Sequence, residues 1–333
     1  MELNLRYDLN SPPFGAPHAD LYRTAIEQSV WADKLGFDQV FLAEHHGAEH
    51  GYCPSSMVLA GAVLGATEQI IAHLSALVVT LHDPIRLAED LAVLDNISNG
   101  RIWFTAGMGY RPHEFEMFGK DIKKRLGLMN HVLDTVQKAW TGEPFEYEGH
   151  MVRVTPKPVQ EGGPKIYMGG STDKSAIRAA KRGYQYFPGH PDLFKVYEEE
   201  RAKAGFPPPE KHLKPSASFL YVSDDPDRDW QVLAPHISYA TNTYAGWAKE
   251  RGTGETRYQE VTSIEDLKAM DHIKVLTPDA CFEYLKEMGP DTRVTFHALL
   301  GGLDPEVSWR SLRLFESDVL PRLVSEGLVN LKK

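Results

Sequence analysis

The sequence predicts an α/β fold of the (β/α)8 TIM barrel class, with one domain over residues 1–333. Eight apolar runs rich in β-branched residues recur along the chain, and a helical pattern follows each of them. Asp-Pro pairs, which start helices, follow several runs, at 83–84, 225–226 and 304–305. The alternative fold is a doubly wound open sheet, but the segment 10–15 after the first run lacks its glycine-rich dinucleotide fingerprint.

The expected strands are short and each precedes a helix. They lie at Leu3–Tyr7, 36–44, Ile70–Thr80, Ile102–Ala106, Lys165–Met168, Tyr184–Phe187, Ser216–Val222 and Arg293–Leu299. The first helix is expected over roughly Asp20–Leu35, because its apolar residues share one face: Tyr22, Ala25, Ile26 and Val30.

Two segments depart from simple alternation of strand and helix. A long helix is expected from about Phe115 to Trp140, followed by a hairpin over 145–152 with Gly149 in its turn. An irregular insertion is expected between the seventh and eighth units, at Ser238–Lys274. A loop of that length inside a compact domain is typical of a lid or a binding loop.

Composition and charge narrow the class of protein. With 42% hydrophobic and 25% charged residues, the chain matches an ordinary globular enzyme, and no signal peptide or membrane span is recognised. The formal net charge of −10 argues against nucleic-acid or anionic-membrane partners. Cys53 and Cys281 lie in different expected units, so neither a disulfide framework nor a thiolate metal site is expected. A cytoplasmic location is the prediction.

The main candidate site is Glu44-His45-His46, which follows the second strand. Active sites of barrels and open α/β sheets are built at such strand ends. One histidine is expected to act as a general acid or base, with Glu44 as its orienting partner, although packing in the rim would also explain the cluster. Metal binding is the weaker alternative, because no spacing requires His82, Asp83 or His297 to converge with these residues.

Two glycine-containing turns follow later strands. The turn 107–111 contains Gly107, Gly109 and Tyr110, and its glycines would let the backbone approach a flat ligand. The turn 169–175 opens a helix directly after the fifth strand, where amide and hydroxyl groups suit a phosphate. Plain helix capping by Thr172 or Asp173 is the alternative for the second turn, and an ordinary loop is the alternative for the first.

Several segments, in this order, resemble the bacterial luciferase-like monooxygenase family. They are 36–38 with 44–46, 83–90, 94–95 with 98–101, 114–115 with 118–119, 164–167 with its Gly-Ser-Thr turn, and 314–321. The resemblance covers most of the chain and is strongest over Met1–Ala180 and Thr277–Leu323.

The resemblance implies a barrel that binds a reduced flavin, FMN or a deazaflavin, at its C-terminal mouth, in a protein that is often a homodimer. By position, His45 matches the catalytic histidine of luciferase. The residues that match flavin-binding positions are Ser75 and Ala76 in a third-strand bulge, Arg125 on the phosphate, and Thr172 and Ser175 as phosphate-binding hydroxyls. From their place in the two glycine-containing turns, Gly107, Gly109, Tyr110, Gly170 and Ser171 are also expected to bind the cofactor.

The sequence departs from luciferase at Gly107, where luciferase has a reactive cysteine, and at Met108, where it has another phosphate-binding arginine. These differences argue against light emission and a long-chain aldehyde substrate. The expected function is oxygenation of a small organic substrate by reduced FMN and O2, with a separate NAD(P)H-dependent flavin reductase. The alternatives are a deazaflavin-dependent hydride-transfer oxidoreductase, a non-catalytic flavin-binding protein and, least favoured, a metal-dependent hydrolase.

Overall fold

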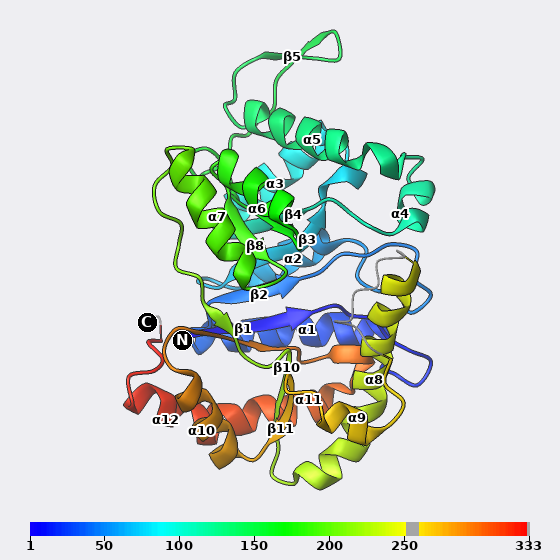
Figure 1. Cartoon of the computed structure of the whole chain (residues 1–333), viewed down its shortest axis with the longest axis vertical. Coiled ribbons are helices and arrows are strands. Elements are labelled where there is room, and N and C mark those ends of the chain that lie inside the picture. The colour runs from blue at the N-terminus through cyan, green and yellow to red at the C-terminus, as the bar shows by residue number, and fades with distance from the viewer. Residues whose placement is uncertain (251–259, 332–333) are drawn as a thin grey trace. The chain divides into compact units, whose positions relative to one another are not determined.

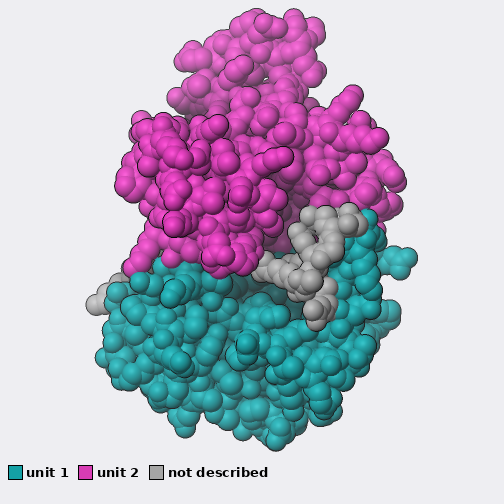
Figure 2. Space-filling view, viewed as in Figure 1, with its two compact units in different colours: residues 1–41, 48–53, 213–333 teal, residues 42–47, 54–212 magenta. Residues whose placement is uncertain are grey.

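The computed structural model describes residues 1–250 and 260–331. Its residues cluster into two compact units, shown in Figure 2. Unit 1 contains Met1–Phe41, Ala48–Cys53 and Leu213–Lys333, and unit 2 contains Leu42–Gly47 and Pro54–His212. Within the described ranges, no helix is both long enough and apolar enough to cross a membrane.

The fold is of the expected α/β class, with a parallel sheet of 8 strands in the order β8-β7-β4-β3-β2-β1-β12-β9. The strands are β1 (Glu2–Tyr7), β2 (Gln39–Leu42), β3 (Ile71–Val78), β4 (Ile102–Gly107), β7 (Lys165–Gly170), β8 (Gln185–Pro188), β9 (Lys214–Pro215) and β12 (Thr292–Phe296). Each lies within a few residues of an expected strand or, in the case of β9, just before one. The apolar β-branched runs therefore form buried parallel strands, as their composition predicts.

Unit 2 contains β3, β4, β7 and β8 with their connecting helices (Figure 1). The helical segments are α2 (Ser56–Ala66), η1 (Val79–Leu81), α3 (Pro84–Ser98), α4 (Pro112–Met117), η2 (Ile122–Lys124), α5 (Arg125–Ala139), α6 (Asp173–Lys181) and α7 (Asp192–Lys203). The Asp83 side chain accepts from the Arg86 amide and caps α3, and Asn99 ends that helix in the left-handed conformation. A small antiparallel hairpin, β5 (Phe145–Tyr147) with β6 (His150–Val152), confirms the expected turn at Gly149.

Unit 1 contains β1, β9 and β12 together with a separate parallel pair, β10 (Phe219–Val222) and β11 (Ile273–Leu276). Its helical segments are α1 (His18–Lys34), α8 (Pro226–Glu250), α9 (Ile264–Lys268), α10 (Pro278–Met288), η3 (Leu300–Gly302), α11 (Pro305–Leu314), η4 (Phe315–Val319) and α12 (Leu320–Ser325). Buried residues of β10, β11 and α8 form one hydrophobic cluster of this unit, which includes Phe219, Trp230 and Val275.

Three expectations about the elements were wrong. The long helix over 115–140 is divided into α4 and α5, because Gly119 adopts a φ of +63° between them. The expected seventh strand is β10, which pairs with β11 instead of joining the 8-stranded sheet, where the two-residue β9 stands beside β12. The insertion at 238–274 is not irregular throughout, since α8 continues to Glu250 and β11 begins at Ile273. Part of the expected lid, residues 251–259, lies outside the described residues.

Candidate functional site

The site in unit 2 is built where β3 and β4 end. The register of these strands shifts between Ser75 and Leu77, where the third-strand bulge was expected, and the Ser75–Ala76 peptide is cis. A Cβ placed on Gly107 would lie 3.0 Å from the Ala76 Cβ and 3.2 Å from the Leu77 carbonyl oxygen. The bulge and the end of β4 therefore pack backbone to backbone, which only small residues allow.

His45 is held by a carboxylate from α4. Its Nδ1 lies 2.8 Å from Glu114 Oε1, and the same oxygen accepts the backbone amide of His46 at 3.1 Å. Arg111 Nη1 lies 3.5 Å from that oxygen and donates to the His46 carbonyl at 3.2 Å. Because the Glu114 carboxylate accepts, we assign the hydrogen to Nδ1, which makes Nε2 the nitrogen that can accept a proton.

The Nε2 edge of the His45 ring lies next to Tyr110. The Tyr110 hydroxyl lies 3.3 Å from His45 Nε2, and the two rings meet edge to face with centroids 5.5 Å apart. The side chain of His45 is 11% exposed, whereas that of Glu114 is fully buried. The imidazole is thus nearly buried, and its partner carboxylate is kept from water.

Glu114 remains ionised in this setting. Burial alone would raise its pKa, but the hydrogen bond and charge of His45, the His46 amide and the nearby Arg111 lower the pKa below its ordinary value. An ionised carboxylate behind an imidazole fixes the ring and stabilises its protonated form.

Glu44 has a different pair of partners. Its Oε1 lies 2.8 Å from His46 Nε2 and 3.2 Å from His82 Nε2, and Ser56 donates to its other oxygen at 3.4 Å. Burial would raise the pKa of Glu44, but these hydrogen bonds and the two histidines lower it to about 2. The expectation that Glu44 orients His45 was therefore wrong, because Glu114 occupies that position.

Sequence reasoning missed Glu114 for a geometric reason. It lies 69 positions after His45, on a helix that was expected only from about Phe115 onward. The available signal was Arg111-Pro112, since proline favours the first position of a helix and would have placed Glu114 in its first turn. The expected order of strands and helices does not show which later helix places a side chain beside the end of β2.

The second turn of unit 2 begins α6. Thr172 and Ser175 form a capping box, in which each side chain bonds the backbone amide of the other residue, at 3.3 and 3.2 Å. The buried Ser175 hydroxyl also lies 3.0 Å from the Tyr186 hydroxyl, and a Cβ on Gly170 would collide with Ser175. The capping role is therefore present, while Ser171 and Thr172 are exposed at the same helix start.

Gly109 and Arg125, two further residues expected to bind the cofactor, also lie in unit 2. Gly109 has a φ of +69°, and a Cβ there would press on Phe115, so the turn after β4 requires glycine. Arg125 is half-buried at the start of α5, where its Nη1 donates to the Ile122 carbonyl at 3.2 Å. In the described part of the chain, no hydrogen bond joins Arg125 to Thr172 or Ser175.

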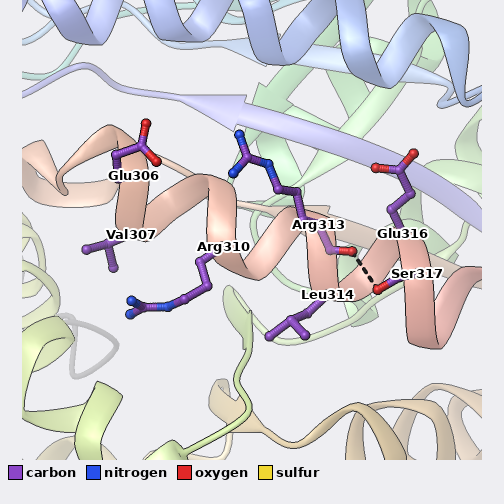
Figure 3. Close-up of a pocket in the computed structure, with 7 residues that line it drawn as sticks. All are labelled: Glu306, Val307, Arg310, Arg313, Leu314, Glu316 and Ser317. Atoms are coloured by element: carbon purple, nitrogen blue, oxygen red, sulfur yellow. Dashed lines mark hydrogen bonds between the residues drawn. The ribbon is translucent and has the colours of Figure 1, made fainter.

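Over residues 1–250 and 260–331, no group of three or more His, Cys, Asp or Glu side chains is placed to hold a metal ion. A groove in unit 1 runs along α11 and η4 (Figure 3), but Arg310 and Arg313 point to different sides of the helix. Arg310 is already paired with Asp229 at 2.9 Å, so the groove offers no convergent set of donors.

The profile of the luciferase-like monooxygenase family matches residues 9–288. The alkanal monooxygenase alpha chain of Photorhabdus luminescens is 30% identical over 157 residues, which are 46% of this chain and 43% of that protein. The chain thus spans about half the length of the curated relatives it matches.

Two solved structures share the fold. One is the oxygenating constituent of 3,6-diketocamphane monooxygenase from Pseudomonas putida in complex with FMN, with a TM-score of 0.74, 21% identity, and coverage of 97% of this chain and 98% of that one. The other is an F420-dependent secondary alcohol dehydrogenase, with a TM-score of 0.64, 18% identity, and coverage of 92% and 97%. The family profile covers more than half of the sequence, so this chain belongs to the luciferase-like monooxygenase family of flavin-dependent oxidoreductases.

Proposed function

We propose that the protein uses reduced FMN and O2 to oxygenate a small organic substrate, with His45 as the acid/base residue. The observation that carries the proposal is the His45–Glu114 pair, which presents one imidazole edge at the end of β2. FMN, held by a similar fold in the diketocamphane monooxygenase, is the cofactor we infer. When bound, it would supply the redox chemistry with oxygen that no side chain can supply.

The residues of unit 2 fit a planar cofactor with a phosphate. Ser75, Ala76 and Gly107 bring only small side chains to the ends of β3 and β4, which suits a flat ring system. Gly170, Ser171 and Thr172 lead into the nine-residue helix α6, whose first amides suit an anion. We propose that these residues, together with Gly109, Tyr110, Arg125 and Ser175, hold the cofactor.

The part played by each polar residue follows from its contacts. His45 Nε2 takes up or releases a proton, since Nδ1 is committed to Glu114. Glu114 positions the ring and compensates its charge, while Tyr110, 3.3 Å from Nε2, connects it to a second exchangeable hydroxyl. Glu44, with His46 and His82, fixes the turn that carries His45, and we assign it a supporting role there.

A deazaflavin-dependent oxidoreductase is the second candidate. The similarity to the F420-dependent secondary alcohol dehydrogenase favours it, because the same fold serves that cofactor there. In that case a hydride would be exchanged with the substrate, O2 would not be used, and His45 would supply the proton at the substrate oxygen.

We also infer the partners and setting of the enzyme. A separate NAD(P)H-dependent reductase would supply reduced FMN. Cys53 and Cys281 form no disulfide with each other, which suits the cytoplasmic location that we propose. A homodimer is proposed because Val58, Val93 and Ile97 expose apolar side chains on the packed pair α2 and α3. The fold we propose for the whole chain is one closed (β/α)8 barrel domain.

An isotope experiment tests the proposed reaction. The protein is supplied with chemically reduced FMN and labelled O2, together with a panel of cyclic ketones, aromatic ketones and aldehydes. The expected result is a product that carries one labelled oxygen atom. Reduction or oxidation of a panel compound with F420 and without label would support the second candidate. If neither cofactor gives a product beyond the no-enzyme control, the oxygenase proposal fails.

A further inference from the structure

We infer that unit 1 carries a binding subsite for a planar aromatic ligand with a neutral carbonyl oxygen, recognised by Arg6 and an aromatic wall on α8. The subsite lies at the C-terminal ends of β1 and β12, where ligands bind in parallel α/β folds. Calling this ligand the substrate rests on the proposed function, whereas the binding itself does not.

The alternation of side chains places Arg6 on the face of the sheet away from the helices. Tyr7 donates to Gln28 of α1 at 2.9 Å, and Gln28 in turn donates to Ser308 of α11 at 2.8 Å, so Tyr7 faces the helical layer. Neighbouring residues on a strand point to opposite sides, which puts Arg6 on the other face. On β12, Phe296 packs on Phe315 of η4, so His297 shares the face of Arg6.

A buried carboxylate fixes the arginine in place. Arg6 Nε lies 3.2 Å from Asp8 Oδ1, and Asp8 is 2% exposed. Tyr244 donates to Asp8 Oδ2 at 3.1 Å, and His297 Nε2 lies 3.1 Å from the same oxygen without the alignment of a hydrogen bond. Burial would raise the pKa of Asp8, but the charge of Arg6 and the hydrogen bonds that Asp8 accepts keep it well below its ordinary value.

The guanidinium of Arg6 has donors left over. The Nε atom is used by Asp8, and Nη2 makes only a 3.5 Å contact with the Tyr244 hydroxyl. No hydrogen bond joins Nη1 to a described residue, although the side chain is 38% exposed and its position is set by Asp8. A guanidinium anchored at one edge and open at the other is suited to an oxygen acceptor.

A cluster of aromatic rings adjoins this polar group through Tyr244. The hydroxyl oxygens of Tyr52 and Tyr244 lie 2.7 Å apart. The centroid of the Trp247 ring lies 5.9 Å from that of Tyr52, 5.4 Å from that of Tyr244 and 5.9 Å from that of His50. Tyr239 meets His50 at 5.8 Å. Three of the rings come from α8 and two from 48–53, so both segments of unit 1 form one wall. Tyr52 and Trp247 are buried, whereas His50, Tyr239 and Tyr244 are half-buried and offer stacking and edge contacts to a flat ring.

Charge balance selects a neutral oxygen over an anion. Arg6 and Asp8 cancel, so a carboxylate next to Arg6 would also lie close to the buried Asp8 charge. A carbonyl oxygen accepts from Nη1 without that repulsion. The predicted ligand is therefore an aromatic ketone or aldehyde.

The test compares three probes by calorimetric titration: 2-acetylnaphthalene, 2-naphthoate and naphthalene. Wild-type protein should bind acetylnaphthalene at least about tenfold more tightly than naphthalene, with naphthoate weaker than acetylnaphthalene, as one hydrogen bond to a charged donor would give. In the double variant Arg6→Met/Asp8→Asn, which removes both members of the ion pair, the two neutral probes should bind alike. Trp247→Leu should weaken both to a similar degree, and Arg23→Met, an exposed arginine of α1, should change nothing.

Three outcomes overturn the inference. They are equal binding of the neutral probes by wild-type protein, an undiminished ketone preference in the double variant, and tightest binding of naphthoate. If the double variant does not fold, Arg6→Lys serves as a second test, because it keeps the positive charge beside Asp8. It should reduce the preference for 2-acetylnaphthalene over naphthalene to less than about threefold, because the planar guanidinium is lost. Titration of the same proteins with FMN separates the cofactor proposal from the subsite proposal. If wild-type protein does not bind FMN, the cofactor proposal is refuted, whereas the result with the three probes still stands.

Discussion

A single carboxylate decides how His45 can act. Glu114 bonds Nδ1 and is itself buried, so the imidazole has one ionisable edge and one fixed orientation. Metal ligands and catalytic bases are held in the same way, by an outer partner that sets the tautomer. The chemistry at residue scale therefore depends on a pair of residues that lie far apart in the sequence.

Replacement of either member of that pair should slow the reaction more than it disturbs the fold. We expect His45→Ala to lower turnover by about 100-fold or more, because general acid/base catalysis is worth that much, with nearly unchanged flavin affinity. Glu114→Gln should lose about tenfold or more, because an amide can also donate to Nδ1 and reverse the tautomer. Product formation by purified variants measures both effects.

The matched control for these variants is His150→Ala, an exposed histidine of the β5–β6 hairpin. Its turnover should equal that of wild-type protein. Normal turnover in His45→Ala would remove that residue from the mechanism.

Glu44 should contribute to stability in a defined acid range. Its pKa is about 2 in the folded protein against an ordinary 4.5, so its stabilising effect is complete above about pH 4.5 and is lost as the pH falls toward 2. Below pH 4.5, wild-type protein should lose unfolding free energy more steeply than Glu44→Gln, by up to about 3 kcal/mol. Denaturant titrations across this range measure the difference, and parallel curves for the two proteins would show that Glu44 is not the group responsible.

At the scale of elements, the start of α5 and the start of α6 are the proposed phosphate site. Arg125→Ala should weaken FMN binding by about tenfold, as loss of a charged hydrogen bond to phosphate would, and should leave riboflavin binding nearly unchanged. Lys124→Ala, a change to the neighbouring exposed cation, is the matched control and should affect neither ligand. Equal losses of FMN and riboflavin affinity in Arg125→Ala would exclude a role on the phosphate.

Elements with strong local signals were predictable from the sequence, and those decided by distant contacts were not. Asp83-Pro84 and Asp304-Pro305 start helices where expected, because capping is a property of adjacent residues. The two-residue β9 has no such signal, and its place beside β12 decides that β10 pairs elsewhere. The same distinction applies to the site, where His45 lies at a recognisable strand end but its partner Glu114 is set by tertiary folding alone.

At the scale of the whole molecule, the proposed dimer follows from surface composition. Val58 is 73% exposed and Ile97 is 54% exposed, on two helices that pack on each other. We expect light scattering to give twice the mass of the 333-residue chain, and Val58→Asp to shift the protein toward the monomer. Val232→Asp, on α8, is the control and should leave the mass unchanged. A wild-type protein that stays monomeric at all concentrations would contradict the dimer.

The central claim is that the cofactor is FMN and not F420, and one titration tests it most directly. The protein is titrated under anaerobic conditions with reduced FMN and, in parallel, with reduced F420, and both dissociation constants are measured. We predict that reduced FMN binds at least about tenfold more tightly than reduced F420, which corresponds to about 1.4 kcal/mol. Tight binding of F420 with no binding of FMN would contradict it.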